Sequence, residues 1–442
     1  MRKLPGLLAG LLVVAGAASA WNASRDAAPI PWPPPQPPLT EAEFAQPIAD
    51  GLLDADVLEL LPLFNGIRGP QRDLALASAR LFALETFEGN GRTCATCHSV
   101  MNGTFTPEEA RERHARNPDG PLFRAIDSDA GDGKSYERLL RDGTVTVTIP
   151  LPPGVKLADD PDATSVTLLR GTPTFMNVAA LDPILMHDAR APNLQEQALD
   201  ALRVHSQIGR EPMAYELDAI AEVQKGGFTS PEIQAYAMGG PEPGLPEGNT
   251  DAEKRGRAFF VSQRVDTATG HGICAACHSG PLLDTTNEHL AEFFPQIVPL
   301  PGTDLKFGAE QGFRVFTNLS AEINRSKRPV RKWLLQDGSG AWVPVESPDV
   351  GFALAPTVVG VPERYREHLS PALRANIFKI SSLRGIARTP PYFHDNSAGT
   401  LEDAVKHYDE FLRGGFGFVE PQARIGLDER DIADIAAYLR LL

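Results

Sequence analysis

The sequence predicts a mainly α-helical protein made of two tandem domains that are related by duplication. Helical periodicity is one reason, and it is clearest in residues 428–442, where apolar side chains fall on one helical face. Sequence elements that recur in both halves of the chain are a second reason. The third is a shortage of strand signals, the best being the Thr-Val alternation at 144–148. The apolar face of 428–442 consists of Ile432, Ile435, Ala436 and Leu439.

One further helix is expected near the start of each half. The second-half helix begins with a capping box at Thr250–Glu253, whose end residues can satisfy each other's backbone N–H groups, and it carries Phe259 and Phe260. The first-half helix spans about residues 71–86, with the apolar residues Leu74, Leu81, Phe82 and Leu84.

The repeated elements keep their order in the two halves. A Leu-Arg-Gly triplet at 169–171 recurs at 383–385, and a His-Asp pair at 187–188 recurs at 394–395. A leucine follows each of these histidines at the same spacing. Duplication of one domain explains this repetition best.

Two CxxCH motifs, Cys94–His98 and Cys274–His278, use all four cysteines of the chain. This pattern predicts two covalently bound haem c groups, each held by two thioether bonds, with His98 and His278 as the proximal iron ligands. A CxxC redox pair would not need the trailing His. A zinc site would need the two pairs close in sequence, and they lie 180 residues apart.

The N-terminus has the pattern of a secretory signal peptide over residues 1–20. Arg2 and Lys3 precede an apolar run at 7–17, and Ala18–Ala20 offers a small-residue cleavage site. We therefore expect a periplasmic protein without a membrane span after cleavage. An uncleaved anchor is the alternative.

Pro- and Gly-rich stretches predict the domain limits. Residues 21–70 form an N-terminal segment that includes the Pro-rich run 29–38, and a Gly/Pro-rich junction covers 239–249. The domains are then expected at 71–240 and 250–442. A haem domain of this kind needs only on the order of 100 residues, so the surplus length suggests a further task such as a substrate pocket.

The chain is acidic. Residues 1–20 contain two basic and no acidic residues, so their removal changes the formal charge from −15 to −17. This charge argues against nucleic acid as a partner. It would suit a basic, diffusible electron donor, although solubility alone would also explain it.

These residues resemble the bacterial di-haem cytochrome c peroxidase family, in particular its MauG-like branch. The resemblance covers about residues 71–440 and is carried by the CxxCH motifs and by the segments 170–174, 188–197 and 383–394. It implies two class I cytochrome c-like domains with the haems near the domain interface. It further implies a peroxidatic haem in the N-terminal domain and an electron-transfer haem in the C-terminal domain.

The residues available as distal ligands distinguish the two haems. No methionine follows Met238, so the second haem cannot have the Met ligand of ordinary family members. The matching position is Tyr408, and a tyrosine there is typical of the MauG-like branch; His407 is the rival. For the first haem, His114 lies near the offset of a removable distal His, but its charged surroundings favour a solvated helix.

Peroxide cleavage also needs acid–base groups. Gln197 matches the family's distal Gln, and Glu211 is our choice for the distal Glu, with His205 as a competitor. Gln197 and Glu211 are named as the catalytic residues on the basis of this resemblance. The family's relay Trp is replaced by Met186, and the adjacent His187 is interpreted as a buried structural His.

The family also binds Ca²⁺ between the haems, largely through backbone carbonyls. Thr389 and Pro391 match two of the contributors, whereas the expected Asn near Gly171 is missing, so calcium stays open.

The expected function is reduction of hydrogen peroxide to water with electrons from a small periplasmic redox protein, such as a cytochrome c or a cupredoxin. The alternatives are a MauG-like oxidase acting on a protein or organic substrate, a non-enzymatic di-haem electron carrier, and a haem dioxygenase acting on an apolar polymer or lipid. The length and the insertion at about 304–353 argue against a simple carrier. Family members are often dimers, but the sequence itself leaves a homodimer open.

Overall fold

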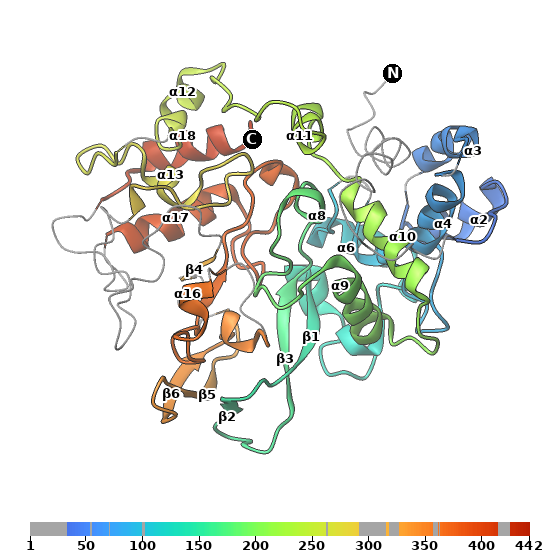
Figure 1. Ribbon diagram of the computed structural model, residues 1–442, viewed down its shortest axis with the longest axis horizontal. Coiled ribbons are helices and arrows are strands. Elements are labelled where there is room, and N and C mark those ends of the chain that lie inside the picture. Colours follow the sequence, from blue (N-terminus) through green and yellow to red (C-terminus); the bar gives the residue numbers. More distant parts are fainter. Residues whose placement is uncertain are drawn as a thin grey trace. The chain divides into compact units, whose positions relative to one another are not determined.

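A computed structural model describes residues 33–53, 55–69, 71–99, 102–261, 264–290, 315–317, 327–356, 361, 363–413 and 425–442. The predicted signal peptide and part of the 304–353 insertion lie outside these residues. The described chain divides into two compact units (Figure 1). The first unit contains the residues up to Val147 together with Gly171–Pro183 and Asn193–Glu242, and the second contains the rest. The tandem domain limits at 240 and 250 remain a prediction.

The first unit is built from helices. Helix α4 (Arg72–Ala83) is the helix expected at 71–86; it ends at Ala83 because the next residue, Leu84, leaves the helical conformation with φ −125° and ψ −27°. It packs against α10 (Ala214–Lys225). The other helical elements are α2 (Glu41–Ala49), η1 (Ala55–Leu60), α3 (Leu61–Gly66), α5 (Cys94–Cys97), α6 (Pro107–Arg116), η2 (Ala125–Asp127), α7 (Glu137–Asp142), α8 (Val178–Leu181), α9 (Leu194–Ala201), the π-helical η3 (Leu202–Ser206) and α11 (Pro231–Ala237).

Helix α4 is buried on two sides, which makes it the centre of this unit. Leu76 and Phe82 belong to one apolar cluster, together with residues of α2, α3 and α5. Leu74 and Leu81 belong to a second cluster with residues of α9 and α10. Because α5 contributes Ala95 to the first cluster, the first CxxCH motif is anchored directly on the core of the unit.

The second unit combines helices with short strands. Its helical elements are α12 (Asp251–Arg257), α13 (Ile273–Cys277), η5 (Phe352–Leu354), α16 (Glu363–Arg366), η6 (Ile386–Arg388), α17 (Leu401–Leu412) and α18 (Glu429–Leu439). Its strands are β2 (Val155–Leu157), β4 (Val315–Thr317), β5 (Arg331–Gln336), β6 (Trp342–Ser347) and β7 (Ile377–Lys379). The chain passes between the units within β1 (Thr144–Pro150), which contains the predicted 144–148 strand, and again at the end of β3 (Ser165–Gly171).

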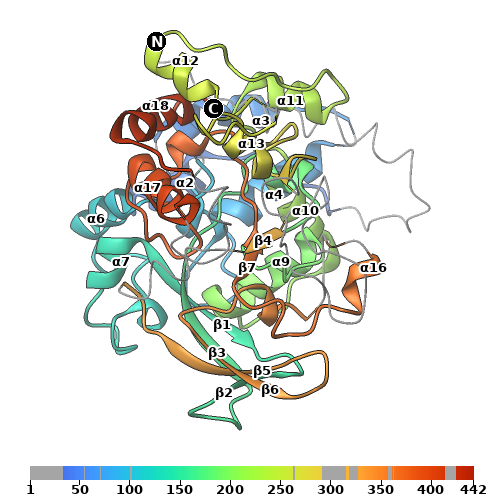
Figure 2. The ribbon, with the colours of Figure 1, turned by 90° about the vertical axis from the view of Figure 1, so that its left-hand side faces the viewer.

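The strands form small antiparallel sheets. Strands β2, β5 and β6 pair in that order, and β4 pairs with β7 (Figure 2). In β5, Trp333 and Leu335 point to the buried side, whereas Lys332 is exposed. The sequence analysis did not predict this three-stranded sheet, because Lys, Gln and Pro interrupt the apolar alternation of β5 and β6.

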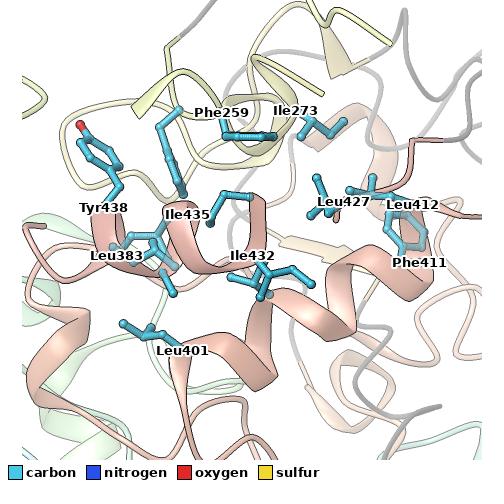
Figure 3. Close-up of a cluster of buried hydrophobic side chains, with 14 of the residues drawn as sticks. Phe259, Ile273, Leu383, Leu401, Phe411, Leu412, Leu427, Ile432, Ile435 and Tyr438 are labelled. Atoms are coloured by element: carbon cyan, nitrogen blue, oxygen red, sulfur yellow. The ribbon is translucent and has the colours of Figure 1, made fainter. Parts of the chain in front are cut away.

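The core of the second unit lies around α18, whose predicted apolar face is buried at all four positions (Figure 3). Helix α12 approaches α18 so closely that a Cβ on Gly256 would lie 2.1 Å from the carbonyl oxygen of Asp434. The predicted capping box starts α12, since Glu253 N donates to Thr250 Oγ1 and Thr250 N donates to the Glu253 carboxylate. Among the described helices, none is long and apolar enough to cross a membrane.

Candidate haem-binding sites

The first CxxCH motif occupies one turn of helix. Thr93 precedes α5 in an extended conformation, and its backbone N–H donates to Thr96 Oγ1. Cys94 and Cys97 are three residues apart in this turn and therefore lie on the same face. His98 follows in an extended conformation, with its N–H donating to the Cys94 carbonyl.

The two proximal histidines share one local geometry. His98 Nδ1 lies 2.6 Å from the carbonyl oxygen of Gly103, and His278 Nδ1 lies 2.8 Å from that of Leu283. In both motifs the acceptor is five residues beyond the histidine. A carbonyl can only accept, so Nδ1 carries the proton and Nε2 keeps its lone pair. A metal-binding imidazole is commonly oriented in this way.

The electrostatics agree with neutral imidazoles. Burial lowers the pKa of His98 and of His278, partly offset by their carbonyl partners. The four cysteines form no disulfide. Burial raises the pKa of the Cys94, Cys274 and Cys277 thiols to about 12, so they are protonated at neutral pH. Two thiols and one oriented imidazole in each motif fit a covalently attached haem.

Charged residues surround the first motif. Arg113 of α6 is buried and donates to the Thr96 carbonyl within the motif. Arg92, two residues before Cys94, forms a fully buried ion pair with Asp127 at 2.7 Å. Both arginines lower the pKa of Cys97, against the larger effect of burial. Among the described residues, no comparable arginine influences the pKa of either thiol in the second motif.

His114 lies one residue beyond Arg113 on α6. Its ring is half-buried and meets Phe123 edge-on at 4.8 Å between ring centroids. Its neighbours Glu112 and Ala115 are exposed. The structure thus gives His114 an aromatic packing partner, and its role as a ligand stays untested.

The two residues named as acid–base groups have different surroundings. Gln197 is half-buried on α9. The Glu211 side chain is 63 % exposed and forms an ion pair with the exposed Arg203 at 2.9 Å. No hydrogen bond connects Gln197 with Glu211 in the part of the chain that the structure describes. Glu211 therefore resembles a surface carboxylate more than a buried acid.

The π-helical turn η3, which carries His205, contacts the loop that leads into the first motif. Asn90 Nδ2 donates to the His205 carbonyl, and Asn90 N donates to the Ser206 carbonyl at 2.8 Å. A Cβ on Gly89 would lie 2.2 Å from that carbonyl, so only glycine permits this approach. The Gly-Asn pair before the motif could have indicated this close contact from the sequence, but it was not recognised.

Tyr408 and its rival His407 lie on different sides of α17. His407 is buried and packs against Phe393 at 4.9 Å between ring centroids. The pKa of Tyr408 is raised by burial and by the thiols Cys277 and Cys274. Tyr408 is therefore the residue of this pair that lies near the second motif.

The two residues suggested for calcium are in a turn after η6. Thr389 Oγ1 donates to the Ile386 carbonyl, and the Pro390–Pro391 peptide bond is cis. Among the described residues no cluster of His, Cys, Asp or Glu could hold a metal ion. Backbone carbonyls, the ligands expected for calcium, are not part of such a cluster, so the calcium site remains a prediction.

A buried charge cluster in the second unit was not foreseen. Arg170 is 2 % exposed and donates to both Asp349, at 2.8 Å, and Asp188. Arg190 donates to the second oxygen of Asp188. The repeated Leu-Arg-Gly and His-Asp elements contain Arg170 and Asp188, so a signal was present in the sequence. No sequence pattern indicated a role for Asp349, which lies 179 residues from Arg170 in the chain.

The neighbouring repeat histidines also meet in this unit. The rings of His187 and His394 lie 6.5 Å apart, and His394 stacks on Phe378. Burial, followed by His394 and Arg170, lowers the pKa of His187 to about 3. His187 is therefore a buried neutral histidine, as interpreted from the sequence.

Comparisons with known proteins give structural likenesses only. No protein-family model and no curated protein matches the chain. It is similar to a MauG-like protein associated with microbial copper homeostasis, with 17 % identity, 94 % coverage of both chains and a TM-score of 0.39. It is also similar to the diheme peroxidase BthA from Burkholderia thailandensis, with 16 % identity, 83 % coverage of this chain, 84 % of that one and a TM-score of 0.38. A further match is hydrazine synthase from Kuenenia stuttgartiensis, with 16 % identity, coverages of 72 % and 84 % and a TM-score of 0.32.

Proposed function

We propose that the chain is a periplasmic di-haem c-type oxidoreductase that reduces hydrogen peroxide to water with electrons from a small redox protein. The observation that carries this proposal is the shared geometry of the two motifs. Each presents two thiols on one face of a helical turn and a neutral imidazole whose Nδ1–H is held by a carbonyl. When bound, the haems supply the redox chemistry for the reaction, in which peroxide, two electrons and two protons give two water molecules.

The residues of the chain fix and tune the two sites differently. Cys94, Cys97, Cys274 and Cys277 would hold the haems, and the Gly103 and Leu283 carbonyls keep Nε2 of each histidine available to iron. Near the first motif the charge of Arg92 is balanced by Asp127, and it is the buried Arg113 that favours an anionic ligand or a developing negative charge there. This asymmetry supports two sites with separate tasks.

Proton transfer is assigned to Gln197 and Glu211. Gln197 is half-buried and can orient peroxide through its amide. Glu211 is proposed as the acid by resemblance only, and its side chain is 63 % exposed and forms an ion pair with Arg203.

The test uses the full-length secreted protein. A pyridine haemochrome spectrum and an intact mass should report two covalently retained haems, and Cys94→Ala/Cys97→Ala or Cys274→Ala/Cys277→Ala should each remove one. The wild type should oxidise a reduced small cytochrome c when peroxide is added. Two retained haems without any donor oxidation would reject the peroxidase and leave an electron carrier.

A MauG-like oxidase is the second candidate, and the position of Tyr408 favours it. A phenolate ligand stabilises ferric and higher oxidation states relative to methionine. Besides burial, Cys274 and Cys277 raise the pKa of Tyr408, which supports a location of this tyrosine near the second haem. Peroxide-dependent oxidation of a protein or organic substrate in the absence of an external donor would distinguish this candidate from the peroxidase.

A further inference from the structure

Arg374 of the second unit is a buried arginine without an acidic partner. Its residue is 8 % exposed, and it follows the turn that leads from α16 toward β7. Nη1 donates to the Ala355 carbonyl at 3.0 Å. The Nε atom is fully buried and has no hydrogen-bond partner.

Another deeply buried arginine of this unit has the carboxylate partners that Arg374 lacks among the described residues. Arg170 is paired with two carboxylates, Asp188 and Asp349. At Arg374 burial lowers the pKa, and no carboxylate of the described residues forms an ion pair with the guanidinium. Burying an unpaired cation is unfavourable, so a fold that keeps one is expected to gain a counter-charge.

A second unpaired donor lies on the same backbone turn. The hydroxyl oxygen of Ser370 is buried and has no hydrogen-bond partner. The Arg374 N–H donates to the Ser370 carbonyl at 3.1 Å, so the two residues are one helical turn apart. Residues four apart in such a turn lie on the same side. Two buried donors on one side of a turn present a site for an acceptor.

We propose that Arg374 and Ser370 bind the carboxylate group of a ligand that carries a single negative charge. One guanidinium balances one charge, so a dianion such as phosphate would remain partly uncompensated after burial. The Nε edge of a guanidinium matches the two oxygens of a carboxylate, and the serine hydroxyl can add a third hydrogen bond.

The surroundings favour an apolar remainder on this ligand. The guanidinium carbon lies 6.0 Å from the centroid of the Phe352 ring. Phe352 belongs to a buried apolar cluster that also contains Tyr365 and Leu369. The side chains of this cluster next to the guanidinium are apolar or aromatic. A short aliphatic monocarboxylate therefore fits better than a small inorganic anion.

Two sources can supply this carboxylate, namely a free small molecule or a propionate of a bound haem. The inference does not depend on peroxidase activity, because it rests on the unpaired donors alone. The two sources are separable, since only a free carboxylate can be added to the purified holoprotein.

The experiment measures thermal unfolding and calorimetric binding of the holoprotein with sodium butyrate, using n-butanol and phosphate as comparison probes. Butyrate should raise the melting temperature of the wild type with increasing concentration, and n-butanol should not. In Arg374→Met the affinity should fall at least tenfold, and in the milder Ser370→Ala it should fall severalfold. Arg366→Met is the matched control, because Arg366 is exposed and lies in the same unit.

If the carboxylate is a haem propionate, the same measurements should give a different result. The wild type would then not respond to butyrate, while Arg374→Met would shift a haem reduction potential that Arg366→Met leaves unchanged, and Arg374→Lys would restore it. Absence of both patterns would overturn the proposal, as would phosphate binding as tightly as butyrate. A higher melting temperature in Arg374→Met, with no ligand or haem effect, would likewise show that the cation has no bound partner.

Discussion

The rings of His407 and Tyr408 lie 5.3 Å apart, yet the two side chains meet different surroundings. His407 is 5 % exposed and packs in the core of the second unit. Tyr408 is 42 % exposed as a whole residue, yet its hydroxyl lies deep enough for burial to raise its pKa. The thiols Cys274 and Cys277 raise the pKa of Tyr408, whereas the pKa of His407 is lowered to about 4 by burial. Consecutive side chains on a helix point about 100° apart, so of these two residues of α17 only the tyrosine faces the second motif.

Tyr408→Phe should therefore change the coordination of one ferric haem and raise its reduction potential, since a phenolate would no longer stabilise the oxidised iron. Electron paramagnetic resonance and resonance Raman spectra of wild type and variant provide the measurement. Tyr392→Phe, in the core of the same unit, is the control. Identical spectra for wild type and Tyr408→Phe would remove Tyr408 from the coordination sphere.

The buried cluster around Arg170 should dominate the stability of the second unit. Arg170→Gln leaves Asp188 and Asp349 buried without their shared cation, and breaking such a pair costs on the order of 3–5 kcal/mol. The matched control is Arg203→Gln, which removes an exposed ion pair and should cost less than about 1 kcal/mol. Urea unfolding of the three proteins compares the two losses. Equal losses would contradict the importance assigned to burial.

A pH dependence follows from His187. Its pKa in the folded protein is about 3, against an ordinary value of 6.5, so the unfolded chain binds the proton first as pH falls. The contribution to stability is complete above pH 6.5 and is lost between 6.5 and 3, by roughly 2 kcal/mol at pH 5. Burial is the largest cause of this lowered pKa; His394, Arg170 and Lys379 lower it further, and Asp188 opposes them.

His187→Gln removes this titration. The free energy of unfolding of the wild type should fall more steeply between pH 7 and 5 than that of the variant, and denaturant titrations at fixed ionic strength measure both. Parallel curves would show that His187 does not titrate differently in the folded and unfolded chains.

Local patterns in the sequence predicted the local structure well. The capping box at Thr250, the apolar face of α18 and the strand at 144–148 depend on residues close together in the chain, and the structure confirms each. The CxxCH motifs also act locally, because cysteines, histidine and the carbonyl five residues later lie within one short loop.

Features that need distant partners could not be predicted. Asp349 gains its role only where the fold brings it to Arg170, and the buried position of Arg374 has no signature in a single sequence. The surroundings of Glu211 were equally out of reach of the sequence. A resemblance in spacing suggested a catalytic acid, but exposure and an ion pair with Arg203 depend on the three-dimensional surroundings.

The final prediction concerns Gln197 and Glu211, which the same resemblance named together. Gln197→Leu should lower peroxide turnover by more than about tenfold, because an acid–base or orienting group commonly contributes at least that much. Glu211→Gln should leave turnover within about twofold, because the Glu211 side chain is 63 % exposed and is held in a surface ion pair with Arg203. Initial rates of donor oxidation at saturating peroxide, normalised to haem content, measure both variants. A large loss in Glu211→Gln with unchanged haem content would restore Glu211 as the catalytic acid and would mean that its ion pair with Arg203 opens during turnover.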